Sequence, residues 1–459
     1  MSQKSNVKSF LRLTFDLLTF DRSSTMKILI IGSGGREHAL AWKIKQSPRV
    51  EKIYCAPGNG GISEIAECVN IEVMDIPALV KFAKEKKIDL TVVGPESPLV
   101  AGIVNEFEKA KLKIFGPSRE AAQLEGSKVF AKEFMHRRNI PTAVFKVFDD
   151  IKEAKDFLNK AQFPLVVKAD GLAAGKGVMV CKALNEAMEA VDQIMAEKIF
   201  QEAGSKIVIE ECLEGDEVSI LAISDGERFC MLEASQDHKR IFDDDIGPNT
   251  GGMGAYSPTP VVNSELMKKI EGRVIEPTIR GMAKEGNPFK GVLYAGLMIT
   301  LDGPKVLEFN VRLGDPETQA ILPRLKDDLV EVMLASCEGK LTEGKLRWDR
   351  RSCVCVVMSS GGYPGKYSMG YEILGLDAIE ESQAMIFHAG TKKQGDKFFT
   401  AGGRVLGVTS LGQGIEKAIN RTYEAVEKIK FERCFFRRDI GAKALQKVNR
   451  DLSAASGRR

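Results

Sequence analysis

Short apolar segments alternate with amphipathic stretches over the first quarter of the chain. Strands that are apolar on both faces and alternate with helices indicate a parallel sheet covered on both sides. A helical pattern at 76–86 supports this alternation. Because the carboxyl ends of parallel strands meet at one sheet edge, the turns that follow the strands are expected to gather there. Three apolar segments are each followed by a turn rich in glycine or proline: 27–31 by 32–35, 52–56 by 57–61, and 90–93 by 94–98.

Beyond residue 127 the pattern changes to hairpins mixed with helices. Apolar segments at 291–300 and 305–311 flank Asp302-Gly303, a hairpin-type turn signal. An amphipathic helix is predicted at 412–429, and further strands at 163–168, 206–211, 217–223, 384–389 and 403–409. We therefore predict a multidomain α/β and α+β protein. Its expected parts are a parallel-sheet α/β domain (26–126), a central α+β region (127–330) and a small α+β C-terminal domain (331–459).

Composition narrows the classes of partner. The chain has 459 residues, 44% of them hydrophobic and 28% charged, with a net charge of +3. A charge so close to balance gives no bulk attraction to nucleic acid or to an anionic membrane. We therefore expect small-molecule partners. We also expect a monomer or weak homodimer, although the charge does not bear on this.

The cysteines and the N-terminal segment carry no clear chemistry. None of the nine cysteines has zinc-ligand spacing, and Cys353 and Cys355 stand in an apolar run that predicts buried thiols. An odd cysteine count fits a reducing, cytoplasmic location. Within residues 1–25 the segment 10–18 is apolar but interrupted by Arg12 and Asp16. Three interpretations are open: a start codon upstream of Met26, an amphipathic accessory segment, or a weak targeting segment. We favour the first and do not expect these residues to be part of the folded domains.

The first candidate site is the turn Gly32-Ser33-Gly34-Gly35, which opens a helix at Arg36-Glu37-His38. Glycines let backbone amides approach an anion at a helix N-terminus. Glu37 stands where the dinucleotide pattern G-x-G-x-x-G needs its third glycine, which disfavours NAD. A phosphate site or a purely structural tight turn remain as interpretations.

A second candidate is Lys168 with the loop 170–177, which holds three glycines and Lys176. Such a loop suits closure over a polyphosphate, although the Walker A spacing is absent. A flexible surface loop with solvated lysines is the alternative. The segment 210–213 ends a strand and offers backbone donors and acceptors for adenine, with Glu217 near for a ribose; a strand edge with exposed acids explains it equally well.

The strand through 306–312 is the strongest candidate. Alternation predicts that Leu307, Phe309 and Val311 face the core, so that Glu308, Asn310 and Arg312 share the opposite face. Two hard oxygen ligands followed by a guanidinium suit Mg²⁺ on phosphates and an anion grip. An ordinary half-exposed strand is the alternative interpretation.

A long polar stretch at 235–257 is a further candidate, because so long a loop in a compact domain usually serves a site. It carries Asp237, His238 and Lys239 beside glycines that bend the backbone. His238 is expected to be structural or substrate-binding rather than a catalytic acid or base.

At these residues the chain resembles the ATP-grasp superfamily, and within it the phosphoribosylamine–glycine ligase family. The motifs that carry the resemblance span nearly the whole chain, from 26 to about 441. They are the segments 34–38, 124–128, 168–177, 247–258 and 312–319. The resemblance implies an N-terminal α/β domain, a central ATP-grasp region with a mobile lid at about 147–214, and a C-terminal domain.

The same resemblance implies roles for individual residues. Catalytic roles fall to Arg312, Lys168 and Asp237. ATP is expected at Lys128, Lys168, Gly175, Lys176, Gly177, Glu210, Glu211, Leu213 and Glu217, and Mg²⁺ or Mn²⁺ at Glu308 and Asn310. The acceptor substrates are expected at Gly34, Gly35, Arg36, Gly58, Asn59, Pro95, Glu96, Asp237, Lys239, Arg312, Gly314 and Asp315. Many relatives place a second acidic ligand about a dozen residues before this glutamate, but 293–297 carries no carboxylate.

The implied activity is ATP-dependent ligation of glycine to phosphoribosylamine in purine biosynthesis, through an acyl phosphate. A carboxylase of the same superfamily would use the same central chemistry with bicarbonate. A nucleotide sensor without turnover is disfavoured because Lys168, Glu308 and Arg312 are all present.

Overall fold

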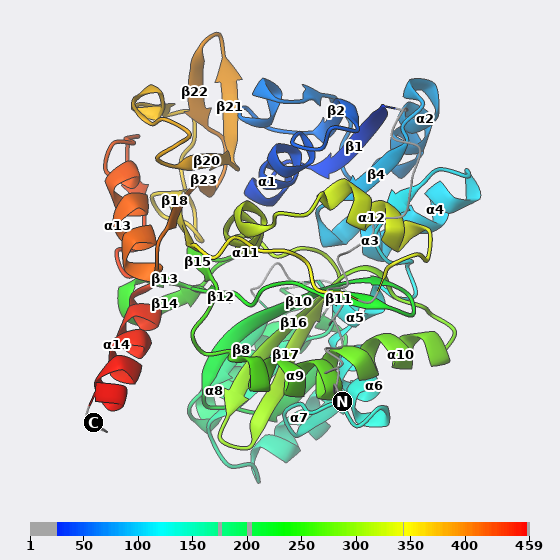
Figure 1. Cartoon of the computed structure of the whole chain (residues 1–459). Helices are drawn as coiled ribbons and strands as arrows, with labels where there is room; N and C mark the ends of the chain where they lie inside the picture. The colour runs from blue at the N-terminus through cyan, green and yellow to red at the C-terminus, as the bar shows by residue number, and fades with distance from the viewer. Residues whose placement is uncertain (1–24, 173–176, 200–203, 343, 457–459) are drawn as a thin grey trace, which may run out of the picture.

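The computed structural model describes residues 25–172, 177–199, 204–342 and 344–456. Figure 1 shows the blue N-terminal elements and the orange C-terminal elements above the green and cyan central sheets. The predicted fold class is confirmed: a parallel-sheet α/β unit is followed by antiparallel sheets with helices. None of the helices in the described part of the chain is long and apolar enough to cross a membrane.

The N-terminal sheet is wholly parallel, in the order β3-β2-β1-β4-β5. Its central strand β1 is buried because neighbours cover both of its faces, as an all-apolar run requires. The strands are β1 (Met26–Gly32), β2 (Val50–Pro57), β3 (Glu67–Cys68), β4 (Leu90–Val93) and β5 (Ile114–Phe115), and the helices are α1 (Gly35–Ile44), α2 (Ile76–Lys86), α3 (Glu96–Ala101) and α4 (Ile103–Lys109).

Two antiparallel sheets form the central region. The first has the order β6-β9-β7-β8, and we call it the lid sheet; the second has the order β11-β10-β16-β17. The helices α5 (Gln123–Gly126) and α6 (Lys128–Arg137) precede them. The strands of the lid sheet are β6 (Phe145–Phe148), β7 (Leu165–Ala169), β8 (Val178–Cys181) and β9 (Ile207–Glu211), and its helices are α7 (Ile151–Leu158) and α8 (Leu184–Val191). The second sheet holds β10 (Asp216–Asp225), β11 (Phe229–Met231), β16 (Lys290–Thr300) and β17 (Gly303–Asn310), with helices α9 (Ser264–Ile270), α10 (Glu276–Lys284), α11 (Glu317–Ile321) and α12 (Leu329–Cys337) nearby.

The C-terminal sheet borrows strands from the long polar stretch. Its order is β12-β15-β18-β23-β20: β15 pairs with β18, which lies far along the chain, and β12 pairs with β15 at the edge of the sheet. The two cysteines of β18 are buried, as predicted. The elements are β12 (Gln236–Asp237), β15 (Gly254–Ser257), β18 (Ser352–Ser360), β20 (Met385–His388), β23 (Arg404–Gly412), β24 (Cys434–Phe435), α13 (Ile415–Val426) and α14 (Ala442–Ser456); the hairpin β13 (Arg240–Phe242) and β14 (Ile246–Asn249) and the small sheet of β19 (Glu372–Ile373), β21 (Thr391–Gln394) and β22 (Lys397–Thr400) lie beside it.

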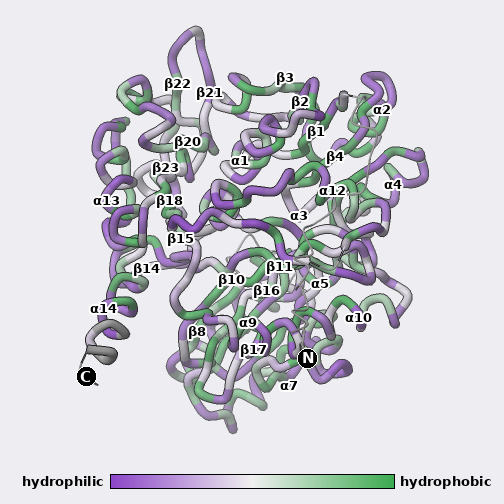
Figure 2. Tube along the Cα trace, viewed as in Figure 1, coloured by the Kyte–Doolittle hydropathy of each residue, from purple (hydrophilic) through white to green (hydrophobic). Residues whose placement is uncertain are grey.

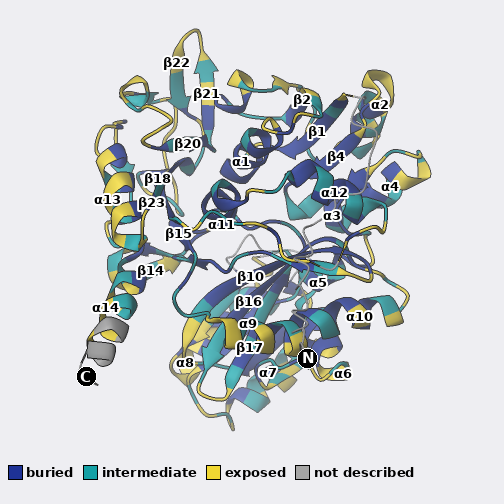
Figure 3. Cartoon of the chain, viewed as in Figure 1, coloured by how far each residue is buried: buried dark blue, intermediate teal, exposed yellow. Residues whose placement is uncertain are grey.

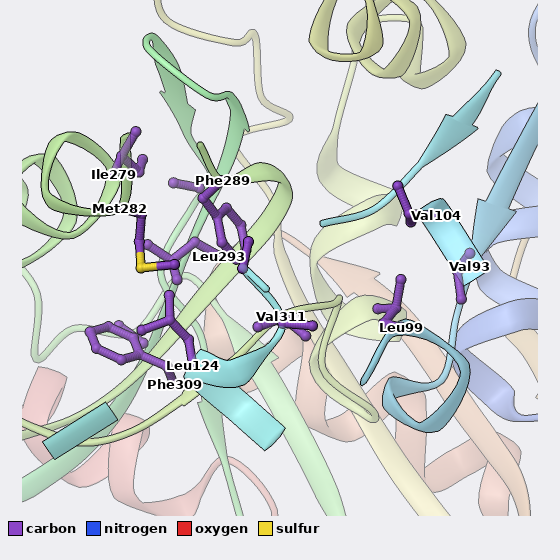
Figure 4. Close-up of a cluster of buried hydrophobic side chains, with 14 of the residues drawn as sticks. Val93, Leu99, Val104, Leu124, Ile279, Met282, Phe289, Leu293, Phe309 and Val311 are labelled. Carbon is purple, nitrogen blue, oxygen red and sulfur yellow. The ribbon is translucent and has the colours of Figure 1, made fainter. Parts of the chain in front are cut away.

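The largest hydrophobic core runs across the boundary between the N-terminal and central parts. Figure 4 shows Phe309 and Val311 from the end of β17 in one cluster with Leu124 and Leu293. Figure 2 shows hydrophobic residues along β10 and β16, and the same two strands are mostly buried in Figure 3. The apolar residues of β17 therefore fix this strand in the hydrophobic core.

One prediction for β17 is wrong. Leu307 is only half-buried, and Val306 takes the core position instead. The reason is a β-bulge: Gly296 pairs with Glu308 and the next residue, Leu297, pairs with Val306. A bulge places two residues opposite one and reverses the alternation locally. Phe309 and Val311 face the core as predicted.

Candidate active site

The three turns of the N-terminal sheet meet at one edge, as predicted. The Gly58 N–H donates to Gly32 O (3.1 Å), and the Gly94 N–H donates to Ile31 O (2.9 Å). The Asn59 side-chain amide donates to Ser33 O (2.8 Å), which joins the second turn to the first. Pro95 is the N-cap residue of α3 on the third turn.

Glu37 explains much of the glycine pattern in these turns. Its carboxylate accepts the Gly34 N–H (2.6 Å) and lies against Gly32 and Gly94, where an added Cβ would overlap the Glu37 side chain. Because the carboxylate fills the space between two turns, these two glycines have a structural task. The interpretation as a structural tight turn therefore accounts for part of the motif. The N–H groups of Gly35 and Arg36, at the start of α1, are the part that suits a phosphate.

The Arg36 guanidinium is buried within the protein. Its Nε atom lies 2.6 Å from Glu37 Oε1, and its Nη1 atom donates to Leu313 O (3.0 Å). These two contacts commit the side chain to joining α1 to the segment after β17. Any anion bound at residue 36 is therefore expected to contact its backbone N–H and not its side chain. In this structure that N–H donates to Asp315 Oδ2 (3.4 Å).

Glu308 and Asn310 lie on the same face of β17, beside cationic side chains. Lys239 Nζ lies 3.5 Å from Glu308 Oε1 and also contacts Glu217. Burial alone would raise the pKa of Glu308, but the ammonium groups of Lys239, Lys168 and Lys128 outweigh burial and lower that pKa to about 2. The Glu308 carboxylate is therefore ionised at neutral pH.

Arg312 stands beyond the end of β17 and still shares the face of Asn310. It donates to Asn310 Oδ1 (3.0 Å) and forms ion pairs with Glu125 (2.8 Å) and Glu96 (3.2 Å). Burial raises the pKa of Glu125 to about 7 despite the attraction of Arg312. The guanidinium thus ties the third turn of the N-terminal sheet to the strand that carries Glu308.

Lys168 and the strand β17 lie in contact with each other. Lys168 Nζ donates to Leu307 O (3.1 Å) and lies 2.5 Å from Glu210 Oε1. Lys128 Nζ donates to Gly171 O (2.9 Å), at the start of the glycine-rich loop. Gly177 accepts the Ala169 N–H (2.9 Å) at the end of that loop. Gly175 and Lys176 lie outside the described residues.

The segment 210–213 leaves the lid sheet beside these lysines. The Glu210 side chain is buried, whereas the Glu211 carboxylate accepts from Val144 N (3.1 Å) and Lys305 Nζ (3.2 Å). Leu213 follows the end of β9. The Glu210 carboxylate therefore forms an ion pair with Lys168. Any contact with adenine at residue 210 is expected to come from its backbone.

The polar stretch divides its side chains between two faces. Burial raises the pKa of Asp237 well above its usual value, and the nearby Glu317 and Glu217 carboxylates add to that rise. Lys239 on the same side is held protonated, since neighbouring carboxylates raise its pKa against the effect of burial. His238 between them is 2% exposed and contacts the Tyr256 ring, so it lies in the protein interior, as expected of a structural histidine.

Gly314 and Asp315 join the site to the C-terminal sheet. Asp315 lies 3.4 Å from Arg404 Nη1 and accepts from Gln319 (2.8 Å). A Cβ at Gly314 would overlap the Glu317 carboxylate. Arg404, Glu125 and Lys132 were missed as site residues because their partners Asp315, Arg312 and Glu210 are distant in sequence. Glu37 and Glu317 were also missed, although each packs against a glycine three positions away. Lys132, one helical turn after Lys128, carried a local signal as well.

The donors on β17 fit a divalent cation. Glu308 is ionised and half-exposed, and the Asn310 carbonyl oxygen lies beside it on the same face. Hard oxygen donors of this kind suit Mg²⁺, which usually keeps one or two protein ligands and fills its shell with phosphate and water oxygens. Gly296 pairs with Glu308 across the sheet, so no carboxylate stands at that neighbouring position. Within the described residues no group of three or more His, Cys, Asp and Glu side chains is arranged to hold a metal ion.

Family models match nearly the whole chain. The N domain of phosphoribosylglycinamide synthetase matches residues 26–125, its ATP-grasp (A) domain matches 126–318 and its C domain matches 353–443. The chain belongs to this family. The phosphoribosylamine–glycine ligase of Caldanaerobacter subterraneus subsp. tengcongensis is 51% identical over 417 residues, 91% of this chain and 100% of the relative. That of Escherichia coli O6:H1 is 53% identical over 426 residues, 92% of this chain and 99% of the relative.

Two solved structures share the fold of this chain. The phosphoribosylamine–glycine ligase of Thermotoga maritima has a TM-score of 0.79 at 35% identity, over 90% of this chain and 100% of that one. A biotin carboxylase from Campylobacter jejuni, solved as a β-γ-ATP complex, has a TM-score of 0.72 at 15% identity, over 91% of this chain and 94% of that one. At 15% identity the second likeness concerns the fold alone.

Proposed function

We propose that the chain catalyses ATP-dependent ligation of glycine to 5-phosphoribosylamine, giving glycinamide ribonucleotide, ADP and phosphate in purine biosynthesis. The observation that carries the proposal is the convergence of Lys168 with the face of β17 that presents Glu308 and Asn310. Membership of the phosphoribosylglycinamide synthetase family supplies the substrates. ATP is the nucleotide substrate and Mg²⁺ or Mn²⁺ the metal.

The chemistry requires that a carboxylate be activated, because oxide is too poor a leaving group for an amine to displace. The glycine carboxylate attacks the γ-phosphate of ATP, which forms an acyl phosphate and releases ADP. The amine of phosphoribosylamine then attacks the acyl carbon, and inorganic phosphate leaves. Phosphoryl transfer depends on alignment and on neutralising charge. Lys128, Lys168 and Arg312 supply positive charge for these steps.

A metal held by Glu308 and Asn310 would neutralise charge on the transferred phosphate. Lys239, which lies between Glu217 and Glu308, holds its proton and faces the same space. Gly177, Glu210, Glu211 and Leu213 contribute backbone to the nucleotide site, with Glu217 assigned to the ribose.

The acceptor substrate is assigned to the edge of the N-terminal sheet. Its phosphate is placed at the backbone of Gly34, Gly35 and Arg36, and the turns that carry Gly58, Asn59, Pro95 and Glu96 flank it. Asp237, Arg312, Gly314 and Asp315 are assigned to the reacting groups between this edge and β17. The support is that hydrogen bonds and ion pairs join these turns to the segment after β17.

We also propose a division into domains at 26–126, 127–330 and 331–459, with a lid at about 147–214. Strands β7, β8 and β9 of the lid sheet fall within that last range, and β6 overlaps its start. We propose a cytoplasmic enzyme with small-molecule partners, active as a monomer or weak homodimer. All nine cysteines are free thiols, which supports a reducing compartment.

Steady-state ADP release with each substrate omitted in turn tests the function. Turnover must need glycine and phosphoribosylamine together, and the product must contain the glycyl amide. ADP release that depends on bicarbonate instead of glycine would establish the carboxylase alternative. ATP binding without any substrate-dependent release would establish a sensor.

A further inference from the structure

A buried triad of charges lies beneath the proposed nucleotide site. Glu210 Oε2 lies 2.5 Å from Lys132 Nζ, and Glu210 Oε1 lies 2.5 Å from Lys168 Nζ. The side chains of Lys132, Glu210 and Lys168 are 3%, 2% and 7% exposed. Two ammonium groups and one carboxylate leave a net charge of +1 on the triad, in a place that water scarcely reaches. The ionised Glu308 interacts with Lys168 from outside the triad, and the surplus positive charge attracts an anion to the same place.

The triad also joins three elements. Lys132 comes from α6, Lys168 from β7 and Glu210 from β9. Lys132 Nζ donates to Thr142 Oγ1 (2.6 Å), which in turn donates to Val306 O (2.7 Å). The lid sheet is thus attached to β17 at the bulge beside Glu308.

The donors of Lys168 show where a ligand would bind. An ammonium group has three N–H donors. Glu210 and Leu307 O account for two of those of Lys168 among the described residues, which leaves one for an anion. If Lys132 were absent, Glu210 would neutralise Lys168 alone and the attraction for an anion would fall.

We propose that Lys132 is a positioning residue for the nucleotide: it shares the Glu210 carboxylate and so leaves Lys168 with positive charge for a phosphate oxygen of ATP. Lys132 itself does not touch the ligand. This inference rests on the proposed function for the identity of the anion. It explains why a buried glutamate has two lysine partners where one ion pair would balance its charge.

Calorimetric titration of the full chain with ATP and Mg²⁺, without glycine, tests the proposal. Lys132→Met makes the triad neutral and should raise the Kd for ATP about tenfold, the value of one charge-assisted hydrogen bond. Lys132→Arg keeps the charge and should stay within about threefold of the wild type. The double variant Lys132→Met with Glu210→Gln restores the net charge of +1 and should recover most of the affinity.

The double variant separates charge from packing. A purely structural role predicts that removing Glu210 as well makes binding worse, and that result would overturn the proposal. Equal affinity of Lys132→Met and the wild type would also overturn it. Lys43→Met is the matched control, because Lys43 is likewise buried but contacts Leu325 O and lies beside Asp328. This control should lower the unfolding temperature and leave the Kd for ATP unchanged.

Kinetics give a second readout. In Lys132→Met the KM for ATP should rise with the Kd, while kcat at saturating ATP and the KM for glycine change less than about twofold. Wild-type protein that binds ATP with this pattern among the variants but forms no glycyl product would refute the proposed function and leave the role of Lys132 standing.

Discussion

At the scale of single residues, the site depends on carboxylates held in unequal states. Glu308 stays ionised because ammonium groups surround it, whereas burial dominates at Glu125 and raises its pKa to about 7. Asp237 resembles Glu125, since burial and like charges both raise its pKa. Only Glu308 among these three therefore combines a fixed negative charge with a position on the face of β17.

Glu308→Gln tests this assignment. The substitution keeps the side-chain shape but removes the charge that a divalent cation requires, so kcat should fall at least about a hundredfold. The protein should still fold, with a modest fall in unfolding temperature, because the residue is half-exposed but Lys239 loses one of its two carboxylate partners. Glu265→Gln, on the exposed face of α9, serves as a control and should keep full activity. Near-normal turnover of Glu308→Gln would reject Glu308 as a metal ligand.

Gly94→Ala tests the packing of Glu37 between the turns. The added Cβ would overlap the Glu37 carboxylate, so the variant should lose about 1–3 kcal/mol of unfolding free energy, measured in urea. Gly272→Ala is the matched control, because open space surrounds that position in a helical segment. It should be neutral or stabilising by up to about 1 kcal/mol. Equal effects of the two substitutions on the unfolding free energy would show that the Glu37 side chain moves aside at little cost.

At the scale of elements, the pattern of apolar residues predicted strands well and register poorly. The bounds of α2 and the hairpin around Asp302-Gly303 follow from local signals, and both were predicted. The bulge at Leu307 was not, because it depends on how β16 pairs with β17 and leaves no local signature. The same limit hid one partner of Arg36, a residue predicted to bind the acceptor substrate: its side chain contacts the adjacent Glu37 and also the distant Leu313 O.

The affinity for ATP should depend on pH, because Lys132 joins the lid sheet to β17 through a charge that titrates. Burial lowers the pKa of Lys132 to about 8, although Glu210 opposes the shift and Lys168 adds to it; Glu211 also faces this ammonium. As pH rises through 8, Lys132 loses its proton and the triad becomes neutral, so the affinity for ATP should fall. Calorimetry between pH 7 and 9 should show this decline in the wild type. Lys132→Arg, which stays charged, should bind ATP without the inflection, and an inflection that persists there would assign the titration to another group.

At the scale of the whole molecule, the C-terminal sheet holds in place the polar stretch that supplies site residues. Strands β12 and β15, from the stretch that carries Asp237, pair into the sheet built on β18. Asn59 on the N-terminal sheet donates to His388 O (2.8 Å), and the His388 N–H donates to His38 Nδ1 (2.8 Å). The resemblance to the family predicted the N-terminal, central and C-terminal parts. These hydrogen bonds, however, join residues about 330 to 350 positions apart, and motif spacing along the chain does not predict such contacts.

The contact between the two histidines predicts a loss of stability in acid. Burial lowers the pKa of His38 to about 3, with a smaller effect of His388, and burial lowers the pKa of His388 to about 4. Unfolded histidine titrates near 6.5, so below that pH the unfolded chain binds protons that the folded chain refuses. Stability is therefore fully present above about pH 6.5 and falls as pH drops toward 3, by about 1.4 kcal/mol per pH unit for each histidine.

His38→Asn isolates one of these contributions. The Asn side-chain carbonyl supplies an acceptor for the His388 N–H without a group that titrates in this range. Urea unfolding at pH 7 and pH 5 should show a difference in unfolding free energy that is about 2 kcal/mol smaller in the variant than in the wild type. Carboxylates that titrate in the same range contribute equally to both proteins and cancel in the comparison. An identical pH dependence would mean that the wild-type interface opens and hydrates His38 before the chain unfolds, and that the contact between the N-terminal and C-terminal sheets does not limit stability in acid.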